Sequence, residues 1–138
     1  MIYSYNVSEQ NVDANGALIY AIDAVKTGIT VTHSAGTSTF TLNRPGYYYV
    51  TVTASGAASS EGTDPISLAL YNGTDAIPGA VASATSTTAT DIVNLTINTI
   101  IPVRPSCCAI DNTVNLIVMN TGVATTFSNT AITITKLA

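Results

Sequence analysis

The stretch "FTLNRPGYYYVTVTAS" (Phe40 to Ser55) decides the predicted fold. A Pro-Gly pair leads into three consecutive tyrosines and then into alternating Val and Thr. In a β-strand, successive side chains point to opposite faces. The face predicted to lie in the core carries Tyr48, Val50, Val52 and Ala54. The opposite face begins with two large rings, Tyr47 and Tyr49, which we expect another surface to cover.

The composition is that of an uncharged β protein. Charged residues make up 9% of the 138-residue chain, and hydrophobic residues make up 46%. No apolar run approaches the roughly 18–20 residues that cross a bilayer as a helix. The 23 Thr and 12 Ser supply the polarity that charges usually provide. Because little electrostatic repulsion opposes association, we expect an oligomer.

The charge distribution gives no sign of a nucleic-acid or membrane partner. The net charge is −4, and the four basic residues are scattered along the chain. A binding surface for phosphate backbones or anionic lipid needs clustered Lys and Arg. The first ten residues lack the basic and apolar regions of a signal peptide. We therefore expect either synthesis in the cytoplasm or an excised fragment capped by Met1.

Short apolar or alternating segments, separated by Gly, Pro and Asn, occur along the whole chain. This pattern predicts one all-β domain over residues 1–138, either a sandwich or a barrel. The Asn72-Gly73 pair is the clearest hairpin signal. The predicted strands are residues 2–7, 17–22, 29–33, 38–42, 47–55, 65–71, 80–85, 91–103, 113–120 and 130–137.

The order of these segments resembles the C1q/TNF-like jelly-roll family. Members have a Phe-containing strand, a turn ending in Pro-Gly and a strand rich in aromatic residues. A later strand has alternating apolar residues, and the last strand ends in Lys-Leu. The residues of this chain that fit are Phe40, Pro45, Gly46, Tyr48, Tyr49, Val50, Val114, Leu116, Val118, Ile132, Ile134, Lys136 and Leu137.

The resemblance implies a ten-stranded, two-sheet jelly-roll sandwich that assembles as a homotrimer. One tyrosine after the Pro-Gly pair then fills the core, and its neighbour faces another subunit. We assign Tyr48 to the core and Tyr49 to the trimer contact, with Tyr47 as a further candidate. In the alternative, Tyr47 and Tyr49 lie under a loop such as residues 56–65. The expected core comprises Tyr48, Val50, Val52, Phe40, Leu116, Val118, Ile132 and Ile134.

The chain lacks the collagen-like stalk and basic receptor loops of eukaryotic family members. Its Thr- and Ser-rich style is more similar to jelly rolls of phage virion proteins and of bacterial spore-surface collagen-like glycoproteins. This resemblance implies a structural protein of a virion, such as a head fibre, decoration protein or fibre tip, with capsid or fibre proteins as partners. The alternative is a trimerisation domain or adhesin of a spore or cell surface that binds a glycan or protein.

An adhesin would use the loops at residues 56–65, 83–90 and 121–130. Sugar sites commonly contain an exposed aromatic platform, and these loops offer Phe127 alone. The adhesin hypothesis is therefore the weaker one.

Catalysis is not expected. The single histidine, His33, lies at a strand end with no acidic residue close to it in the sequence. A nucleophile needs a neighbouring base, and the eight acidic residues are dispersed in a way that suits turns. We predict a core-edge or interface role for His33, and no cofactor.

Two smaller features leave alternatives open. Glu61 and Asp64 are weak candidates for a calcium site, because hard cations prefer oxygen ligands, but no spaced loop motif supports one. The adjacent Cys107 and Cys108 are either reduced apolar residues, subunit contacts near a symmetry axis, or a vicinal disulfide or metal site.

Overall fold

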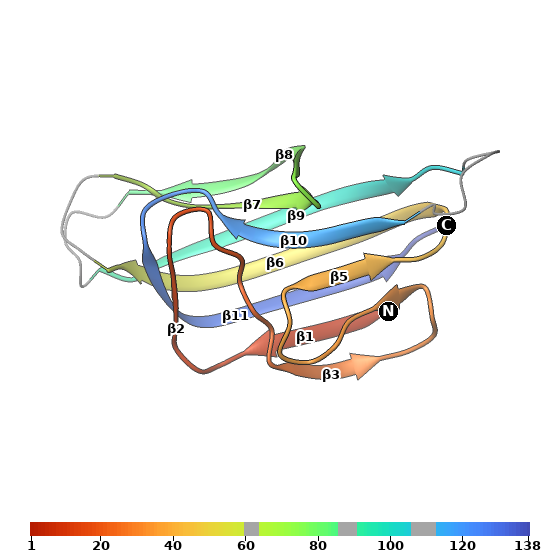
Figure 1. Ribbon diagram of the computed structural model, residues 1–138, viewed down its shortest axis with the longest axis horizontal. Coiled ribbons are helices and arrows are strands. Elements are labelled where there is room, and N and C mark those ends of the chain that lie inside the picture. The colour runs from red at the N-terminus through yellow and green to blue at the C-terminus, as the bar shows by residue number, and fades with distance from the viewer. Residues whose placement is uncertain (60–63, 86–90, 106–112) are drawn as a thin grey trace.

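The computed structural model describes residues 1–59, 64–85, 91–105 and 113–138 and consists of two stacked antiparallel sheets (Figure 1). The strands are β1 (Ile2–Asn6), β2 (Gln10–Val12), β3 (Ile22–Lys26), β4 (Val31–Thr32), β5 (Thr39–Leu42), β6 (Gly46–Ala58), β7 (Ile66–Asn72), β8 (Asp75–Ala84), β9 (Val93–Val103), β10 (Val114–Asn120) and β11 (Thr125–Lys136).

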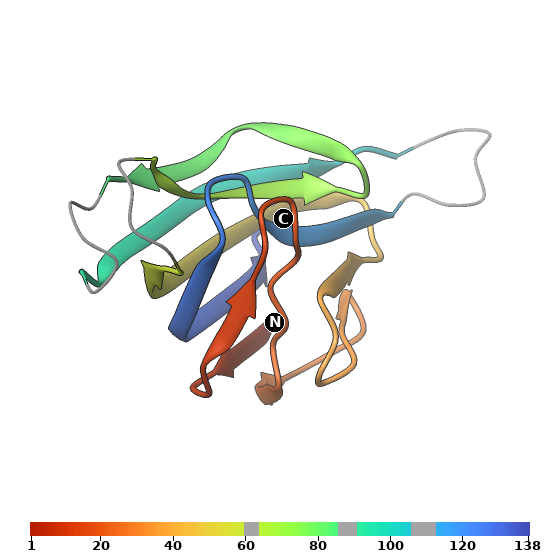
Figure 2. The same cartoon turned by 60° about the vertical axis from the view of Figure 1, so that its left-hand side comes forward.

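The larger sheet has the order β3-β1-β11-β6-β9, with β2 also paired to β11. The smaller sheet has the order β4-β5-β10-β7-β8. The chain crosses repeatedly between the two layers, so that several neighbouring strands, such as β1 and β11 or β5 and β10, are distant in sequence (Figure 2). This all-β, two-layer arrangement is the predicted jelly roll.

The 13-residue strand β6 is an interior strand of the larger sheet and pairs with β11 on one side and with the edge strand β9 on the other. Its side chains alternate strictly between the core and the outer face. The core lies between the sheets and is formed by inward-facing side chains of both layers. The expected core residues, all at most 1% exposed, are Tyr48, Val50, Val52, Phe40, Leu116, Val118, Ile132 and Ile134.

The number of strands differs from the prediction, since the described residues form eleven strands and not ten. The segment predicted as a strand at residues 17–22 is not one, and of its residues Ile22 alone belongs to a strand, as the first residue of β3. Leu18 and Tyr20 are fully buried, but their backbone amides make isolated hydrogen bonds, to the carbonyls of Val118 in β10 and of Thr37 before β5. This crossing segment contributes apolar side chains without joining a continuous ladder. Two strands, β2 and β3, are additional to the prediction. Strand β2 carries a single core residue, Val12, and β3 carries none, so neither has enough of a pattern to be predicted.

Two predicted loops are partly strand. Strand β6 continues to Ala58, and β11 begins at Thr125, because the residues at 56–58 pair with those at 125–127. Gly56 permits this pairing, since a Cβ there would lie 2.8 Å from Cδ1 of Phe127. The small residues that suggested a loop instead leave room beside the strand for the buried ring of Phe127.

A β-bulge in β11 reverses the direction in which its side chains point. Phe127 pairs with Gly56 and Asn129 pairs with Ser55, so Ser128 is an extra residue in the ladder. Before the bulge, Phe127 faces the core, and after it Thr130, Ile132 and Ile134 do. Odd positions therefore face inward on one side of Ser128 and even positions on the other.

The Pro-Gly turn before β6 is fixed by Tyr48. Its hydroxyl donates to the carbonyl of Arg44 at 2.8 Å and accepts from the Arg44 amide at 3.3 Å. Burial raises the pKa of the Tyr48 hydroxyl above its usual value, so the group remains a donor. Gly46 follows with φ +145°, and a Cβ there would lie 2.2 Å from the carbonyl oxygen of Ala138. Only glycine fits this close approach.

We predict that Gly46→Ala lowers the free energy of unfolding by more than about 2 kcal/mol, because it combines backbone strain with a backbone clash. Gly73→Ala is the matched control. Gly73 also has positive φ, +61°, but a Cβ there meets nothing within 4 Å. The control should lose only about 1 kcal/mol. Equal losses for the two variants in denaturant titrations would contradict the close-approach argument.

We predict that removing the hydroxyl has opposite effects on the stability of the fold at the two buried tyrosines, Tyr20 and Tyr48. Tyr20 is fully buried, and its hydroxyl has no hydrogen-bond partner in the described part of the chain. Tyr20→Phe should therefore stabilise the fold by about 1 kcal/mol, whereas Tyr48→Phe should destabilise it by about 1–2 kcal/mol. Urea unfolding of both variants tests this pair. Destabilisation by Tyr20→Phe would show that its hydroxyl has a partner.

Candidate functional site: the neutral face of the larger sheet

The outward side of β1, β11, β6 and β9 forms a surface without charged side chains, which we call the neutral face. Its position follows from strand alternation, because each residue here lies next to a core residue in its own strand. The neutral face consists of Tyr3, Tyr5, Asn129, Ala131, Thr133, Thr135, Tyr47, Tyr49, Thr51, Thr53, Ser55, Asn94, Thr96, Asn98, Ile100 and Pro102.

Large side chains lie in two groups on this face. The Tyr3 and Tyr5 rings of β1 are 5.9 Å apart between centroids. On β6, Tyr49 is paired across the ladder with Ile100, and Tyr47 lies at the strand start. The exposed fractions are 36% for Tyr3, 57% for Tyr47, 40% for Tyr49 and 54% for Ile100. These are large apolar surfaces to leave in water.

Between and beside these rings the neutral face is polar but uncharged. Ser55 Oγ donates to Asn94 Oδ1 at 2.6 Å, and the Tyr49 hydroxyl donates to Asn98 Oδ1 at 3.5 Å. A hollow of about 430 Å³ lies at the Ser55 end of the face. The residues that line it include Tyr3, Thr53, Ser55, Asn94, Thr96 and Asn129.

Charged residues are displaced from both sheet faces. In the described part of the chain they lie in connections, at the ends of strands or on the edge strand β3. Those in connections are Glu9, Asp13, Arg44, Asp64, Asp91 and Arg104. Asp75 begins β8, Lys136 ends β11, and Asp23 and Lys26 belong to β3. The neutral face thus has charged surroundings but no charge of its own.

The structure places the three consecutive tyrosines on opposite sides of one strand. Tyr48 is fully buried, whereas Tyr47 and Tyr49 are exposed. The described residues of the loop at 56–65 leave Tyr47 and Tyr49 exposed. Both rings lie near the first residue of β6, and that loop follows the other end of the strand (Figure 1). Within one chain, solvent reaches both rings.

His33 is 4% exposed and lies directly after β4. Although no acidic residue is close to it in sequence, the fold brings Asp23 within 2.6 Å of its Nδ1. Its Nε2 contacts the carbonyl oxygen of Thr37 at 2.9 Å. Both ring nitrogens therefore have partners inside the protein.

The remaining candidates are not brought together with these residues. Glu61, Cys107 and Cys108 lie outside the described residues, while Asp64 is exposed before β7. Among the described residues, no group of His, Cys, Asp and Glu could hold a metal ion. Phe127, expected in a loop, lies in β11 and is 1% exposed. It therefore provides no aromatic platform for a sugar.

That Tyr3, Tyr5 and Ile100 belong to the neutral face was not predicted from the sequence. The alternation in "IYSYNV" (residues 2–7) predicts that Tyr3 and Tyr5 share a side of one strand. It does not reveal that this strand lies in the same sheet as β6, because β11 separates the two. The sequence signal existed for each strand, but the shared face depends on strand order.

No family model and no curated protein sequence matches the chain. Solved structures do match over 99% of its length. Eiger TNF from S. frugiperda aligns with a TM-score of 0.70 and 14% identity over 92% of that chain. The PRD1 vertex protein P5 aligns at 0.61 and 16% over 96% of its chain.

Murine APRIL, solved at pH 5.0, aligns with a TM-score of 0.58 and 8% identity over 98% of that chain. The chain has a C1q/TNF-like jelly-roll fold. The predicted fold is thereby confirmed, and one structure that shares it is a phage vertex protein. No helix in the described residues is long and apolar enough to cross a membrane.

Proposed function

We propose that this protein is a non-enzymatic structural component of a phage virion, a head fibre, decoration or fibre-tip protein that works as a homotrimer. The observation that carries the proposal is the neutral face, with its exposed tyrosines on two interior strands, β1 and β6. The likeness of the fold to a phage vertex protein supports the virion setting. The expected partners are two further copies of the chain and capsid or fibre proteins.

The neutral face has the composition of a subunit interface. Interface cores are depleted of charged residues and enriched in tyrosine, and this face has four tyrosines and no charge. Burying one tyrosine removes about 150–250 Å² from water, or roughly 4–6 kcal/mol of gross transfer free energy. In a closed ring of three, each copy would bring this face against a different surface of its neighbour.

The environment of His33 supports a role without catalysis. A general base must lie within hydrogen-bond reach of a substrate proton. The His33 nitrogens instead contact Asp23 and the Thr37 carbonyl, and the ring is 4% exposed. The chain's single imidazole is therefore occupied by structural contacts.

A spore or bacterial cell surface is the alternative location. The genes beside this one distinguish the two, because a virion protein should be encoded among capsid or tail genes. A collagen-like repeat upstream in the same reading frame would place the protein on a spore or cell surface and would remove the virion proposal.

Multi-angle light scattering should give a mass of three times 14.2 kDa. Tyr49→Ala should yield monomer or aggregate, since it exposes the remaining interface and removes a central ring. Tyr71→Ala, in the smaller sheet, is the comparison and should remain trimeric. A monomeric wild-type chain, or an intact and equally stable Tyr49→Ala trimer, would contradict the assigned contact.

Thr53→Lys tests the face without removing a ring. Thr53 is exposed at the middle of the neutral face, so a lysine there is compatible with the folded protomer. Burying the unpaired ammonium in an interface would cost several kcal/mol, and we expect dissociation. Ser83→Lys makes the same charge change on exposed β8 and should leave the assembly mass unchanged. A trimeric Thr53→Lys protein would place the interface elsewhere.

A further inference from the structure

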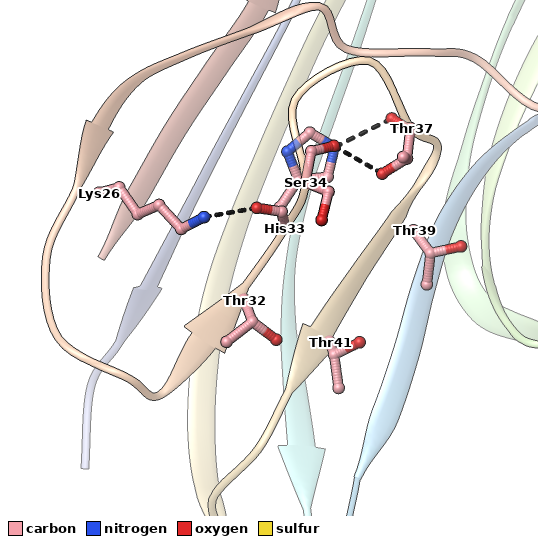
Figure 3. Close-up of a pocket in the computed structure, with 7 residues that line it drawn as sticks. All are labelled: Lys26, Thr32, His33, Ser34, Thr37, Thr39 and Thr41. Atoms are coloured by element: carbon pink, nitrogen blue, oxygen red, sulfur yellow. Dashed lines mark hydrogen bonds between the residues drawn. The ribbon is translucent and has the colours of Figure 1, made fainter.

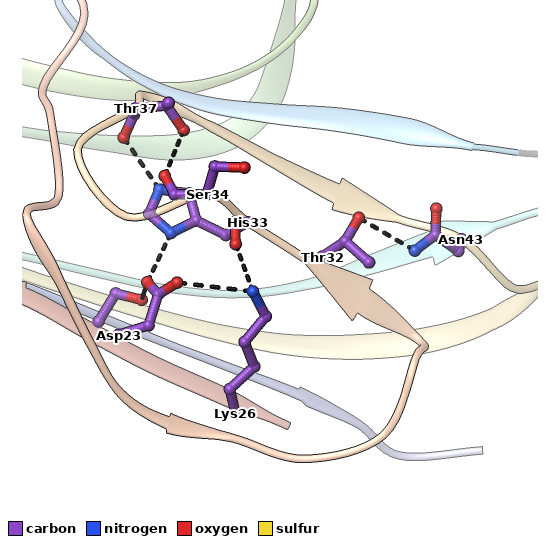
Figure 4. Close-up of polar contacts among 8 residues, drawn as sticks. Asp23, Lys26, Thr32, His33, Ser34, Thr37 and Asn43 are labelled. Carbon is purple, nitrogen blue, oxygen red and sulfur yellow. Dashed lines mark hydrogen bonds and ion pairs between the residues drawn. The ribbon is translucent and has the colours of Figure 1, made fainter.

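One side of the sandwich is closed by a polar cluster that joins the two sheets. The chain leaves the larger sheet at β3, enters the smaller sheet at β4 and then turns through residues 33–37. Side chains of Asp23 and Lys26 from β3 meet His33 after β4 (Figure 4). We call this junction the histidine seam.

Asp23 is the centre of the histidine seam. Its Oδ1 accepts a hydrogen bond from Ser4 Oγ of β1 at 2.6 Å and lies 2.6 Å from His33 Nδ1. Its Oδ2 lies 3.7 Å from Lys26 Nζ, which also donates to the His33 carbonyl. The Asp23 side chain is 11% exposed, so this carboxylate depends on these partners for its polar contacts.

His33 faces an acceptor at each ring nitrogen. A carboxylate oxygen lies beside Nδ1, and a carbonyl oxygen, that of Thr37, lies beside Nε2. The ring itself is stacked on Phe40, with centroids 4.0 Å apart and planes inclined by 8°. Packing against Phe40 prevents the ring from turning toward other partners.

We infer that His33 carries two ring protons in the closed seam, and that the seam loosens when one of them is lost. A neutral imidazole has one N–H and one lone pair, so it can donate only one of these two bonds. The other nitrogen would then face an oxygen lone pair across a buried contact. Only the imidazolium donates to both oxygens, and its charge is balanced by Asp23.

The charged groups that face the ring set the sign of the effect. Asp23 of β3 stabilises the doubly protonated ring, and Lys26 of the same strand opposes it. Lys26 is the more exposed of the two, at 45% against 11%, so its charge is better screened. The hydroxyl of Tyr20, whose ring contacts Phe40, is neutral because burial raises its pKa. The seam is therefore closed at acidic pH and loosens as pH rises.

The backbone hydrogen bonds next to His33 include one that shares an acceptor with its ring, so a change in the protonation of the ring would affect them. The Gly36 amide donates to the Tyr20 carbonyl at 2.8 Å, and the Tyr20 amide donates to the Thr37 carbonyl, which also contacts His33. A hollow of about 470 Å³ adjoins this turn and is lined by Lys26, Thr32, His33, Ser34, Thr37, Thr39 and Thr41 (Figure 3). Loosening the seam would change the wall of this hollow.

The protonation of the ring is measured directly by ¹⁵N-detected NMR of the intact protein, since the chain has one histidine. We expect two protonated ring nitrogens at about pH 5.5, where the seam is closed, and one at about pH 9, where it has loosened. A ring with a single proton already at pH 5.5 would overturn the inference.

Hydrogen exchange tests whether the seam follows the ring. The protection factor of the Gly36 amide, which corrects for intrinsic exchange, should fall about tenfold between the two pH values, the effect of losing one hydrogen bond. The amide of Val52 in β6 should not change. Parallel behaviour of Gly36 and Val52 would overturn the inference even if the ring titrates.

Asp23→Asn removes the balancing carboxylate and should abolish the pH dependence at Gly36. Asp75→Asn, at the β7–β8 hairpin, makes the same charge change away from the seam and should retain it. If Asp23→Asn does not fold, the wild-type NMR and exchange measurements still decide the question. Unchanged pH dependence in a folded Asp23→Asn protein would contradict the role of Asp23.

Discussion

The structure depends on the strict alternation of side chains along β6. This strand is paired over almost its whole length on both sides, so its two faces are continued by β11 and β9. One face supplies Tyr48, Val50 and Val52 to the core, and the other carries Tyr47 and Tyr49 outward. The core and the neutral face are therefore the two sides of the same ladder, and a shift in strand register would alter both at once.

The neutral face and the placement of charge have a common physical basis. A charged side chain on the neutral face would be hydrated in a single chain, but a second surface placed over the face would remove that water. Threonine suits strand geometry, and threonine and asparagine both form hydrogen bonds at lower desolvation cost than a charged group. Charges at the ends of strands remain hydrated, while the sheet surface stays suitable for contact.

Most of the fold could be predicted from the sequence, because alternation is a local signal. The strand containing the three tyrosines, its buried side and the two-sheet architecture required only the period of two. The strand order was implied only by the resemblance to a family. That Tyr3 and Tyr5 share a face with Tyr49 depends on this order and cannot be predicted from any single segment. The β-bulge at Ser128 and the close approach of Gly46 to Ala138 depend on partners more than 70 residues away.

The histidine seam shows the limit of sequence reasoning most clearly. Asp23 and His33 are ten residues apart, one on β3 of the larger sheet and the other directly after β4 of the smaller sheet, so no spacing rule connects them. What brings them together is the crossing between β3 and β4, which is itself irregular and carries few alternating residues. The contact could be found only after the crossing segment had been placed.

The bulge at Ser128 determines which changes of chain length this fold can absorb. Ser128 is accommodated outside the ladder, so its removal would leave Phe127 and Asn129 opposite Gly56 and Ser55 and facing as they do now. Removing any other residue within β11 would invert every side chain on one side of the deletion, so that core and surface residues exchange places. Insertions and deletions within the paired strands should therefore survive in evolution only as pairs or together with a bulge of this kind. Single-residue length variation among relatives should be confined to the connections at the two ends of the sandwich, where no ladder transmits the shift.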